Sequence, residues 1–288
     1  MHLQEVKRVK TITRKEFLRD YVKPQKPVVI ENLIEDWPAY KKWNLDYIKE
    51  IAGEREVPLY DQTPVKHELG FNEPHAKMQM SDYIDLLKKG PTYYRIFLYN
   101  VIKEIPALKT DFKFPKIGLR LLKRVPMLFF GGENSHVFMH HDIDWANILH
   151  FHFEGEKRCV LFSPEETKNL YKVPHSLITH EGIDFDNPDY KKYPALKKAK
   201  GYVAHLNHGD TLYMPEGYWH YMKYITPGFS MSLRALPRSV KHLRYALYNV
   251  VFMRHFDVYM RKRKGKVWIE KKNERAIENT HRQHDIAS

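Results

Sequence analysis

The sequence predicts a mainly β domain, an antiparallel barrel or sandwich, with helices flanking it at both ends. From about residue 93 to 236, short aromatic and β-branched runs alternate with turn signals. These signals are Gly131-Gly132, Glu154-Gly155, Asn187-Pro188, His208-Gly209-Asp210 and Pro227-Gly228. The spacing is typical of antiparallel sheets, and the sequence contains neither repeated βαβ units nor a phosphate-binding glycine loop.

The chain divides into a domain of residues 1–236 and a C-terminal basic helical extension, 237–288. Its 288 residues, 43% of them hydrophobic, are enough for one large domain with an appendage. Within the domain, we expect a part built of helices and strands over about 1–92 before the β core over about 93–236. A proline-led, β-branched run at 26–32 predicts a strand in the first part.

Two helices are predicted in the N-terminal part. Residues 43–51 carry apolar side chains at helical spacing, and the pattern stops at Gly53. Ser81 can cap a second helix over 82–89, which ends at Gly90.

After Pro237 the pattern becomes helical again, with two apolar stripes. One consists of Tyr245, Tyr248, Phe252, Phe256 and Tyr259, and the other of Leu243, Leu247, Val250 and Val251. A helix that is apolar on two sides is usually buried, here against the barrel or against a second copy of the chain. The basic run 261–264 ends the stripes, and we expect a polar, mobile tail beyond it.

The protein is strongly basic, with a formal net charge of +13. Residues 239–288 contain 12 Lys and Arg against 5 Asp and Glu, a net +7. A basic surface favours acidic partners, nucleic acid included, although a well-solvated surface explains the same composition.

The single cysteine, Cys159, excludes an internal disulfide and fits a reducing compartment. It lies in an apolar run, which favours core packing over a nucleophilic role. The N-terminus has no apolar leader, and no apolar run approaches the ~20 residues of a membrane span. We therefore expect a soluble, cytoplasmic protein.

The stretch MHHDIDW, residues 139–145, contains a pattern suited to a metal. In a strand, His140 and Asp142 lie on one face, with Asp144 beyond them, while His141 points the other way. Two histidines and one carboxylate leave open coordination positions, which suits a non-heme Fe(II) oxygenase. A third ligand must come from elsewhere in the chain.

The His-x-Asp pattern occurs three times, so it is weak alone. His208 and Asp210 belong to a tight turn, and His255 and Asp257 lie on a predicted helix, where residues two apart do not share a face. The third ligand is expected at His220, after a turn, strand and loop over 209–219. The alternative reading of His220 is an ordinary half-buried histidine.

Four segments resemble the JmjC-type, cupin-like iron- and 2-oxoglutarate-dependent oxygenases over roughly residues 10–236. The pattern is closest to factor inhibiting hypoxia-inducible factor and its bacterial cupin-like relatives. The segments are 27–30 with 42–47, His140 to Asp142 followed by 155–162, the insert 184–190, and 209–215 running to His220. Their order and spacing together are more specific than each segment alone.

The resemblance implies a double-stranded β-helix, the cupin or jelly-roll fold, and the use of Fe(II), 2-oxoglutarate and O2. Under it, His140, Asp142 and His220 are the iron ligands. Lys157 corresponds to the family lysine that pairs with the distal carboxylate of 2-oxoglutarate, a role that suits a compact cation. The alternative for Lys157 is an exposed hairpin lysine.

Further positions follow from the resemblance. Asn147 and Ser232 correspond to polar residues near the cosubstrate. Arg234 departs from the asparagine that the family often has, and Val137 replaces a hydroxyl residue. A tyrosine between residues 93 and 99 is expected to reach the cosubstrate. The candidates are Tyr93, Tyr94 and Tyr99.

The implied activity is hydroxylation or N-demethylation of a macromolecule, most often a protein side chain, with RNA or a ribosome-associated partner as a second option. One rival is a catalytically silent cupin adaptor for nucleic acid or an acidic protein. Another is a different cupin enzyme that also uses His150 and His152. The C-terminal helices resemble dimerising helices, which would place Tyr245, Phe252 and Phe256 in a homodimer interface unless they pack on their own barrel.

Overall fold

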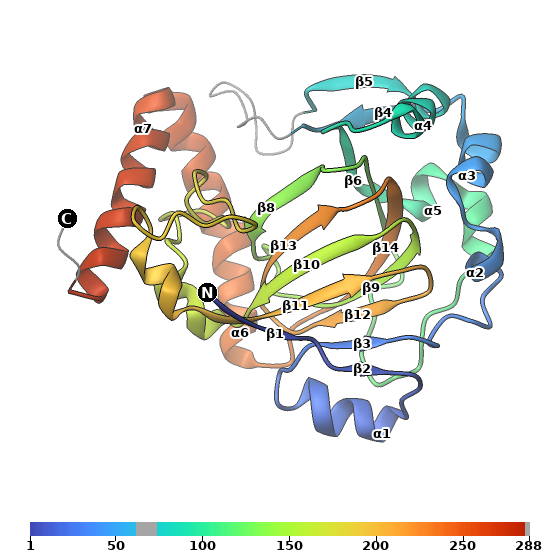
Figure 1. The fold of residues 1–288 in the computed structure, drawn as a ribbon, viewed down its shortest axis with the longest axis horizontal. Coiled ribbons are helices and arrows are strands. Elements are labelled where there is room, and N and C mark those ends of the chain that lie inside the picture. Colours follow the sequence, from blue (N-terminus) through green and yellow to red (C-terminus); the bar gives the residue numbers. More distant parts are fainter. Residues whose placement is uncertain (62–73, 286–288) are drawn as a thin grey trace.

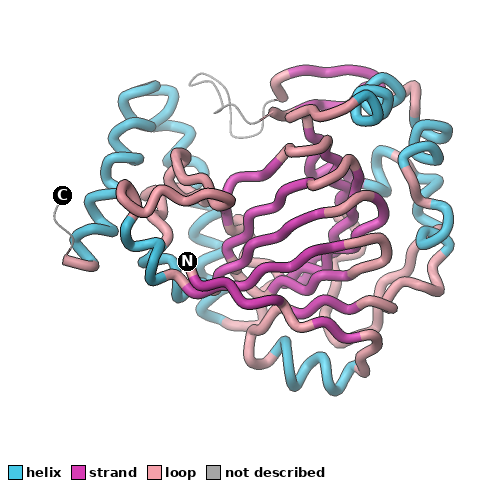
Figure 2. Tube along the Cα trace, in the orientation of Figure 1, coloured by secondary structure: helices cyan, strands magenta, loops and turns pink. Residues whose placement is uncertain are grey.

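The structure is a computed structural model and describes residues 1–61 and 74–285. Two β-sheets face each other, and helices flank them (Figure 1, Figure 2). The larger sheet has seven strands, in the order β2 (Arg8–Val9), β3 (Val28–Ile30), β12 (Thr211–Met214), β9 (Asn147–Glu154), β14 (Gly228–Ala235), β7 (Met127–Gly131) and β6 (Arg95–Asn100).

The smaller sheet faces it with five strands. Their order is β1 (His2–Glu5), β11 (Lys200–Leu206), β10 (Lys157–Phe162), β13 (Trp219–Tyr224) and β8 (His136–His140). A separate hairpin pairs β4 (Glu56–Leu59) with β5 (Ala76–Gln79). Apart from the parallel pairs β1–β11 and β2–β3, the strands of both large sheets are antiparallel. This arrangement is the predicted mainly β, cupin-type fold with flanking helices.

Strand β9 shows how the larger sheet is buried on both faces. Every residue from Asn147 to Phe153 is buried. Phe151 packs in the core cluster that joins this sheet to the N-terminal helices, and Ile148 packs in the cluster between the two sheets. Because side chains alternate along a strand, His150 and His152 share the inward face with Ile148. Polar side chains therefore line part of the interior.

Helices and short turns cover the outer faces of the sheets. The N-terminal group packs on the seven-stranded sheet through Phe17, Ile48 and Tyr83. It comprises α1 (Arg14–Phe17), the π-helical turn η1 (Leu18–Val22), α2 (Pro38–Lys42), α3 (Leu45–Ala52), α4 (Met80–Lys89), α5 (Val101–Glu104) and η2 (Pro106–Thr110). The turns η3 (Pro164–Asn169) and η4 (Pro194–Lys198) flank the smaller sheet.

The two predicted N-terminal helices are present with shifted starts. In α3, the side chain of Asn44 caps the helix by accepting a hydrogen bond from the Tyr47 amide, 2.8 Å away. The prediction that Ser81 caps the second helix is wrong, because α4 already begins at Met80, whose side chain is fully buried. Because Met80 is buried in the core, the helix starts two residues earlier than predicted. The helix ends at Gly90, as predicted.

The C-terminal segment forms a helical hairpin. It contains α6 (Val240–Tyr248), a π-helical turn η5 (Asn249–Met253) and α7 (Arg254–Gln283). Within α7, Gly265 has a φ of +52°, where the chain reverses so that two helical arms lie side by side (Figure 1). The prediction of a mobile tail beyond 261–264 is therefore wrong for the residues up to Gln283.

A buried charge cluster explains why the tail folds back. Asp257 is fully buried, and its carboxylate accepts hydrogen bonds from Lys272 at 2.5 Å, from Trp268 at 2.8 Å and from Arg261 at 2.7 Å. The lysine and the tryptophan lie on the returning arm, so Asp257 ties the two arms together. The third His-x-Asp pattern is thus structural, as its place on a helix predicts.

The apolar stripes of this segment are only partly buried. Phe256 packs on Trp268 within the hairpin, with ring centroids 5.9 Å apart. Leu247 and Val251 remain 63% and 61% exposed. The helix therefore packs in part on its own chain, through the buried Ala246 and Met253, and leaves part of both stripes exposed. Over 1–61 and 74–285, no helix has both the length and the apolar character required to cross a bilayer.

Candidate metal centre

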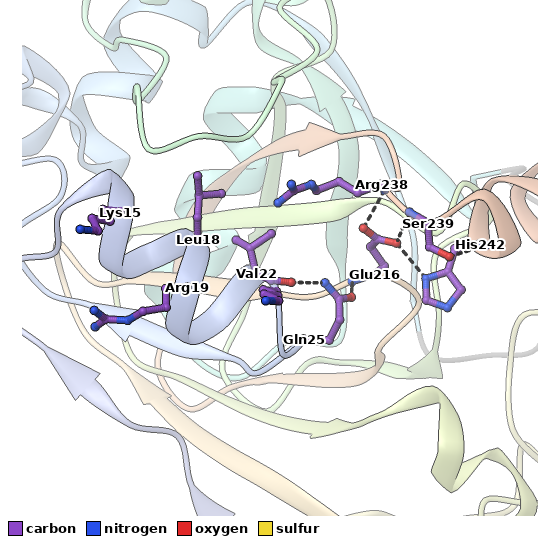
Figure 3. Close-up of a pocket in the computed structure, with 10 residues that line it drawn as sticks. Lys15, Leu18, Arg19, Val22, Gln25, Glu216, Arg238, Ser239 and His242 are labelled. Carbon is purple, nitrogen blue, oxygen red and sulfur yellow. Dashed lines mark hydrogen bonds and ion pairs between the residues drawn. The ribbon is translucent and has the colours of Figure 1, made fainter.

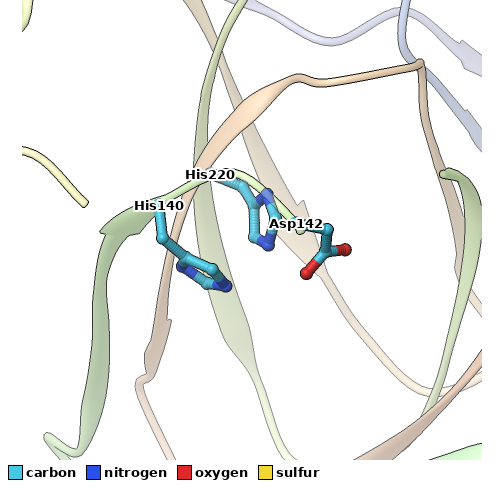
Figure 4. Close-up of side chains that lie close together, drawn as sticks. All are labelled: His140, Asp142 and His220. Carbon is cyan, nitrogen blue, oxygen red and sulfur yellow. The ribbon is translucent and has the colours of Figure 1, made fainter. Parts of the chain in front are cut away.

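Three side chains from distant parts of the chain meet at one end of the interior (Figure 4). His140 ends β8, Asp142 follows in the next loop, and His220 lies near the start of β13, directly opposite His140 in the sheet. One potential ligand atom from each lies within 4.8 Å of the others. The imidazole centroids of His140 and His220 are 4.1 Å apart. This set satisfies the spacing required to hold one metal ion.

Hydrogen bonds prepare both imidazoles as ligands. Nδ1 of His140 lies 2.8 Å from the Phe138 carbonyl oxygen, and Nδ1 of His220 lies 3.0 Å from that of Tyr218. Each Nδ1–H therefore donates to a carbonyl, which leaves the Nε2 lone pair free for a metal. Burial and the neighbouring imidazole of His220 lower the pKa of His140, so His140 is neutral, as a ligand must be.

Asp142 is held by an arginine from the opposite sheet. Nη2 of Arg234, on β14, lies 2.8 Å from Oδ2 of Asp142 and 2.7 Å from Oδ1 of Asp144. Burial opposes ionisation of Asp142, but Arg234 and the nearby imidazoles outweigh it and hold the pKa of Asp142 below its ordinary value. The carboxylate is therefore ionised at neutral pH, and one oxygen stays available to a metal.

A buried ammonium group lies deeper in the interior. Lys157, the first residue of β10, is 2% exposed, and its Nζ lies 2.8 Å from Ser230 Oγ and 4.0 Å from the centroid of the Tyr224 ring. No ion pair links Lys157 to an acidic side chain among the residues that the structure describes. Burial lowers its pKa to about 7. Lys157 is therefore a buried amine without an acidic partner, whose charged form a bound anion would favour, and not the exposed hairpin lysine of the alternative reading.

Two more polar groups face this ammonium group. Nε2 of His150 lies 3.2 Å from Lys157 Nζ. Ser232 pairs with His150 across the sheet, and its buried hydroxyl has no hydrogen-bond partner. Buried polar groups are rarely left unsatisfied, so Lys157 and Ser232 together fit an anionic ligand.

Other predicted residues have different surroundings. Asn147 lies at the start of β9, where its amide donates to Glu216 at 3.1 Å and its oxygen accepts from Tyr213 at 2.8 Å. Asn147 therefore links β9 to β12 and to the loop before β13. His141 points away from the centre, as predicted, and its ring packs edge-on against Trp219 with centroids 4.7 Å apart.

The expectation that a tyrosine of 93–99 reaches the cosubstrate stays a prediction. Tyr93 is 59% exposed, and Tyr94 and Tyr99 pack in the core cluster on the outer face of the larger sheet. The tyrosine ring beside Lys157 is that of Tyr224, which lies directly opposite Lys157 in the sheet. Val137, as a residue packed against the cluster between the sheets, contributes an apolar wall.

The rival that draws more histidines to the metal is not supported by the geometry. His150 contacts Lys157, and His152 bonds Ser230 Oγ and the Gly155 carbonyl oxygen, each at 2.8 Å. Neither belongs to the group of potential ligands. His208, in the second His-x-Asp pattern, bonds the Phe153 carbonyl oxygen in a turn, as its sequence context predicts.

Sequence reasoning missed the partners of Lys157 and the role of Arg234. The alternation of polar and apolar residues in Ser230-Met-Ser232-Leu-Arg234 could have indicated that these three polar side chains face the interior together, because residues two apart in a strand share a face. No comparable signal marks Tyr224, since its position opposite Lys157 depends on how two distant strands pair.

This fold, with two imidazoles, a carboxylate and a buried lysine inside it, is a cupin-type fold with a candidate metal centre. A family model described as a cupin-like domain matches residues 14–257, and the chain belongs to this JmjC/cupin-like family. The match confirms the resemblance seen in the sequence.

Three curated relatives are named for lysine demethylation, for a Jumonji C domain and for tRNA wybutosine synthesis. The chain is 30% identical over 229 residues to "Lysine-specific demethylase 8" of Xenopus tropicalis, covering 75% of this chain and 50% of the relative. It is 32% identical to "Jumonji C domain-containing protein 5" of Drosophila melanogaster, covering 72% and 53%. It is 29% identical to "tRNA wybutosine-synthesizing protein 5" of Homo sapiens, covering 75% and 72%.

The chain spans about half the length of the first of these relatives. The matches do not establish a special likeness to factor inhibiting hypoxia-inducible factor, which stays a prediction.

Proposed function

We propose that the chain is an Fe(II)- and 2-oxoglutarate-dependent oxygenase that hydroxylates or N-demethylates a macromolecular substrate. The observation that carries this proposal is the combination of His140, Asp142 and His220 with the uncompensated ammonium group of Lys157 in one interior. A metal ligand set alone suits many cupin proteins. The second cation suits a cosubstrate with two carboxylates.

The ligand set fits Fe(II). Two neutral imidazoles and one carboxylate are the usual protein donors of non-heme iron oxygenases and leave positions for other ligands. The Nδ1 hydrogen bonds of both histidines fix the tautomer that binds through Nε2. Arg234 holds one carboxylate oxygen of Asp142, which favours binding through the other.

The interior also fits 2-oxoglutarate. Lys157 offers an amine without an acidic partner, and Ser232 offers a buried hydroxyl without a hydrogen-bond partner. A carboxylate would satisfy both groups. A bound carboxylate would also raise the pKa of Lys157 above its value of about 7 in the free protein. With O2, bound Fe(II) and 2-oxoglutarate supply the oxidising power needed to break an unactivated C–H bond. The chain supplies the ligands, the orientation of the cosubstrate and a largely apolar surrounding.

A protein side chain is the substrate that we favour. Relatives are named for lysine demethylation and for tRNA modification, so RNA is the second option. If the reacting carbon is an N-methyl group, hydroxylation leads to demethylation. We place this activity in the cytoplasm, since the only cysteine is a buried free thiol.

Binding of Fe(II) and 2-oxoglutarate together tests the proposal. Anaerobic addition of both should produce the weak metal-to-ligand charge-transfer absorption of a chelated complex. His140→Ala should lose the absorption, and Lys157→Ala should need a higher 2-oxoglutarate concentration to reach it. Lys200→Ala, which removes an exposed lysine from β11, is the matched control and should behave like the wild type. A wild type without this absorption would overturn the proposal.

The basic surface supports a second candidate, the silent adaptor for nucleic acid or an acidic protein. Its signature would be binding that is unchanged in Asp142→Ala, together with no succinate formation by the wild type. An oxygenase gives succinate in the wild type and none in the variant.

We also propose a homodimer through the C-terminal segment. Val240, Leu243 and Leu247 lie on one side of α6 and are 67%, 47% and 63% exposed. Of the residues expected in the interface, Tyr245 and Phe252 are 42% and 52% exposed, and all three, Phe256 included, contact rings of their own chain. Light scattering should give a dimer at micromolar concentration, and Leu247→Asp should give a monomer. A monomeric wild type would contradict the dimer.

A further inference from the structure

A cavity of 680 Å³ opens between the first helix and the start of α6 (Figure 3), and its lining includes none of the candidate metal ligands. We call it the basic cleft. Lys15 and Arg19 line one side, and Arg238 lines the other (Figure 3). Lys23 also lines the cleft. Lys15, Arg19 and Lys23 are four apart along α1 and η1, so they recur on one face of a helical segment.

Little negative charge offsets these cations. Among the residues that the structure describes, Glu216 is the one acidic residue that lines the cleft, and it is 2% exposed. Its carboxylate accepts hydrogen bonds from the Arg238 amide at 2.7 Å and from His242 Nδ1 at 2.8 Å. Arg19 pairs with Asp20, but both are exposed and the pair is weak. In the described part of the chain, Lys15, Lys23 and Arg238 form no ion pair.

The walls of the cleft are fixed before any ligand binds. The side chain of Gln25 accepts from the Glu216 amide at 3.1 Å and donates to the Val22 carbonyl oxygen at 2.7 Å. The Tyr218 hydroxyl donates to the Gln25 carbonyl oxygen at 2.7 Å. These bonds join the segment after η1 to the loop before β13. A preformed site of this kind loses little entropy on binding.

Aromatic rings connect the cleft to the loop of the metal ligand. The His242 ring lies 5.0 Å from Trp145, and Trp145 lies 4.9 Å from Tyr245, between ring centroids. Trp145 follows Asp142 by three residues. Tyr245 is 42% exposed and lies on the side of α6 opposite Leu247, so a dimer through that residue leaves it accessible.

We propose that the basic cleft binds the phosphate backbone of single-stranded RNA, with Tyr245 as a surface on which a base stacks. Cations without partners beside an exposed aromatic ring are the combination that single-stranded nucleic acid uses. An acidic peptide would use the charges but not the ring. The inference goes beyond the proposed function, because the cleft shares no side chain with the metal centre and needs no iron.

Fluorescence anisotropy with a labelled single-stranded RNA of mixed sequence, in the absence of iron, tests the proposal on the full chain. Lys15→Gln/Lys23→Gln/Arg238→Gln should weaken binding about tenfold or more at low salt and reduce the slope of log K against log salt by about 2, roughly 0.7 for each lost phosphate contact. Lys191→Gln/Lys197→Gln/Lys200→Gln removes the same charge from exposed positions elsewhere and is the matched control. Equal losses in the two triple variants would overturn the proposal.

Tyr245→Leu separates RNA from other polyanions. It should weaken RNA binding about fivefold or more, as expected for a lost stacking contact, and leave the salt slope unchanged. Polyglutamate of similar length should compete poorly. The proposal would be rejected if polyglutamate bound as tightly as RNA, which would assign the cleft to acidic proteins. It would also be rejected if Tyr245→Leu bound RNA as tightly as the wild type. The charge-transfer absorption with Fe(II) and 2-oxoglutarate should persist in every cleft variant, which shows that the variants fold and separates this test from that of the oxygenase.

Discussion

The guanidinium group of Arg234 lies 2.8 Å from Asp142 and 2.7 Å from Asp144, so one side chain of the larger sheet fixes the loop that carries a predicted metal ligand. In the sequence, Arg234 is a departure from the asparagine expected at its position. In the structure, it is the ionic partner of the carboxylate. Arg234 is therefore a positioning residue for the metal centre.

Arg234→Lys should weaken metal binding. A lysine keeps the charge but cannot reach two carboxylates with the geometry of a guanidinium group. Loss of such an outer contact typically lowers metal affinity by about 10–100-fold. Calorimetric titration with Fe(II) under anaerobic conditions measures the change. Arg158→Lys, at the Asp186 pair outside the metal centre, is the matched control, and an equal effect there would contradict the assignment.

Adjacent histidines should respond differently to substitution. His140→Ala should abolish iron binding, whereas His141→Gln should retain it, because the His141 ring packs against Trp219 and not toward the centre. Metal content after anaerobic loading and gel filtration measures both. Iron retained by His140→Ala, or lost in a folded His141→Gln protein, would show that the ligand assignment is wrong.

The buried ammonium group should make stability depend on pH. In the folded state the pKa of Lys157 is about 7, against an ordinary value of 10.5, so unfolding takes up a proton between these values. The cost of burying the charge is complete below pH 7 and is relieved as the pH rises toward 10.5. Lys157→Met, which has no charge to bury, should therefore melt at a higher temperature than the wild type at pH 6.

The difference between the two melting temperatures should shrink by pH 9. Other groups titrate equally in both proteins, so the difference isolates Lys157. A constant difference from pH 6 to pH 9 would mean that Lys157 keeps its proton throughout this range.

The hairpin within α7 should depend on Asp257. Asp257→Ala leaves Lys272 buried without its partner, which typically costs about 3–5 kcal/mol. Urea unfolding measures the loss, and trypsin should cleave the variant faster within 261–264. Asp257→Asn/Lys272→Met removes both charges and keeps an acceptor for Trp268, so it should recover most of the stability. Lys266→Ala, at an exposed pair with Glu270, should change stability by less than about 0.5 kcal/mol. A stable Asp257→Ala protein would refute this role.

Local patterns predicted many of the elements and the proposed ligands. Turn residues and short β-branched runs indicated the β core, and the strand character of the run around His140 and Asp142 indicated which His-x-Asp pattern to follow. The start of α4 was missed because burial of Met80 outweighs the capping preference of Ser81. The ordered fold of the helical extension beyond 261–264 was missed, because a polar sequence gives no sign of the buried pair between Asp257 and Lys272.

The sequence by itself determined the chemistry that is available: two histidines and an aspartate for a metal, a lysine for an anion, and a basic surface. Only the tertiary structure decided which groups meet. It placed Tyr224 rather than Tyr99 beside Lys157, assigned Asn147 to Glu216, and gave Asp142 the ionic partner Arg234. The reason is physical, because composition and alternation are local properties of a chain. The register between strands far apart in sequence is set by packing of the whole core.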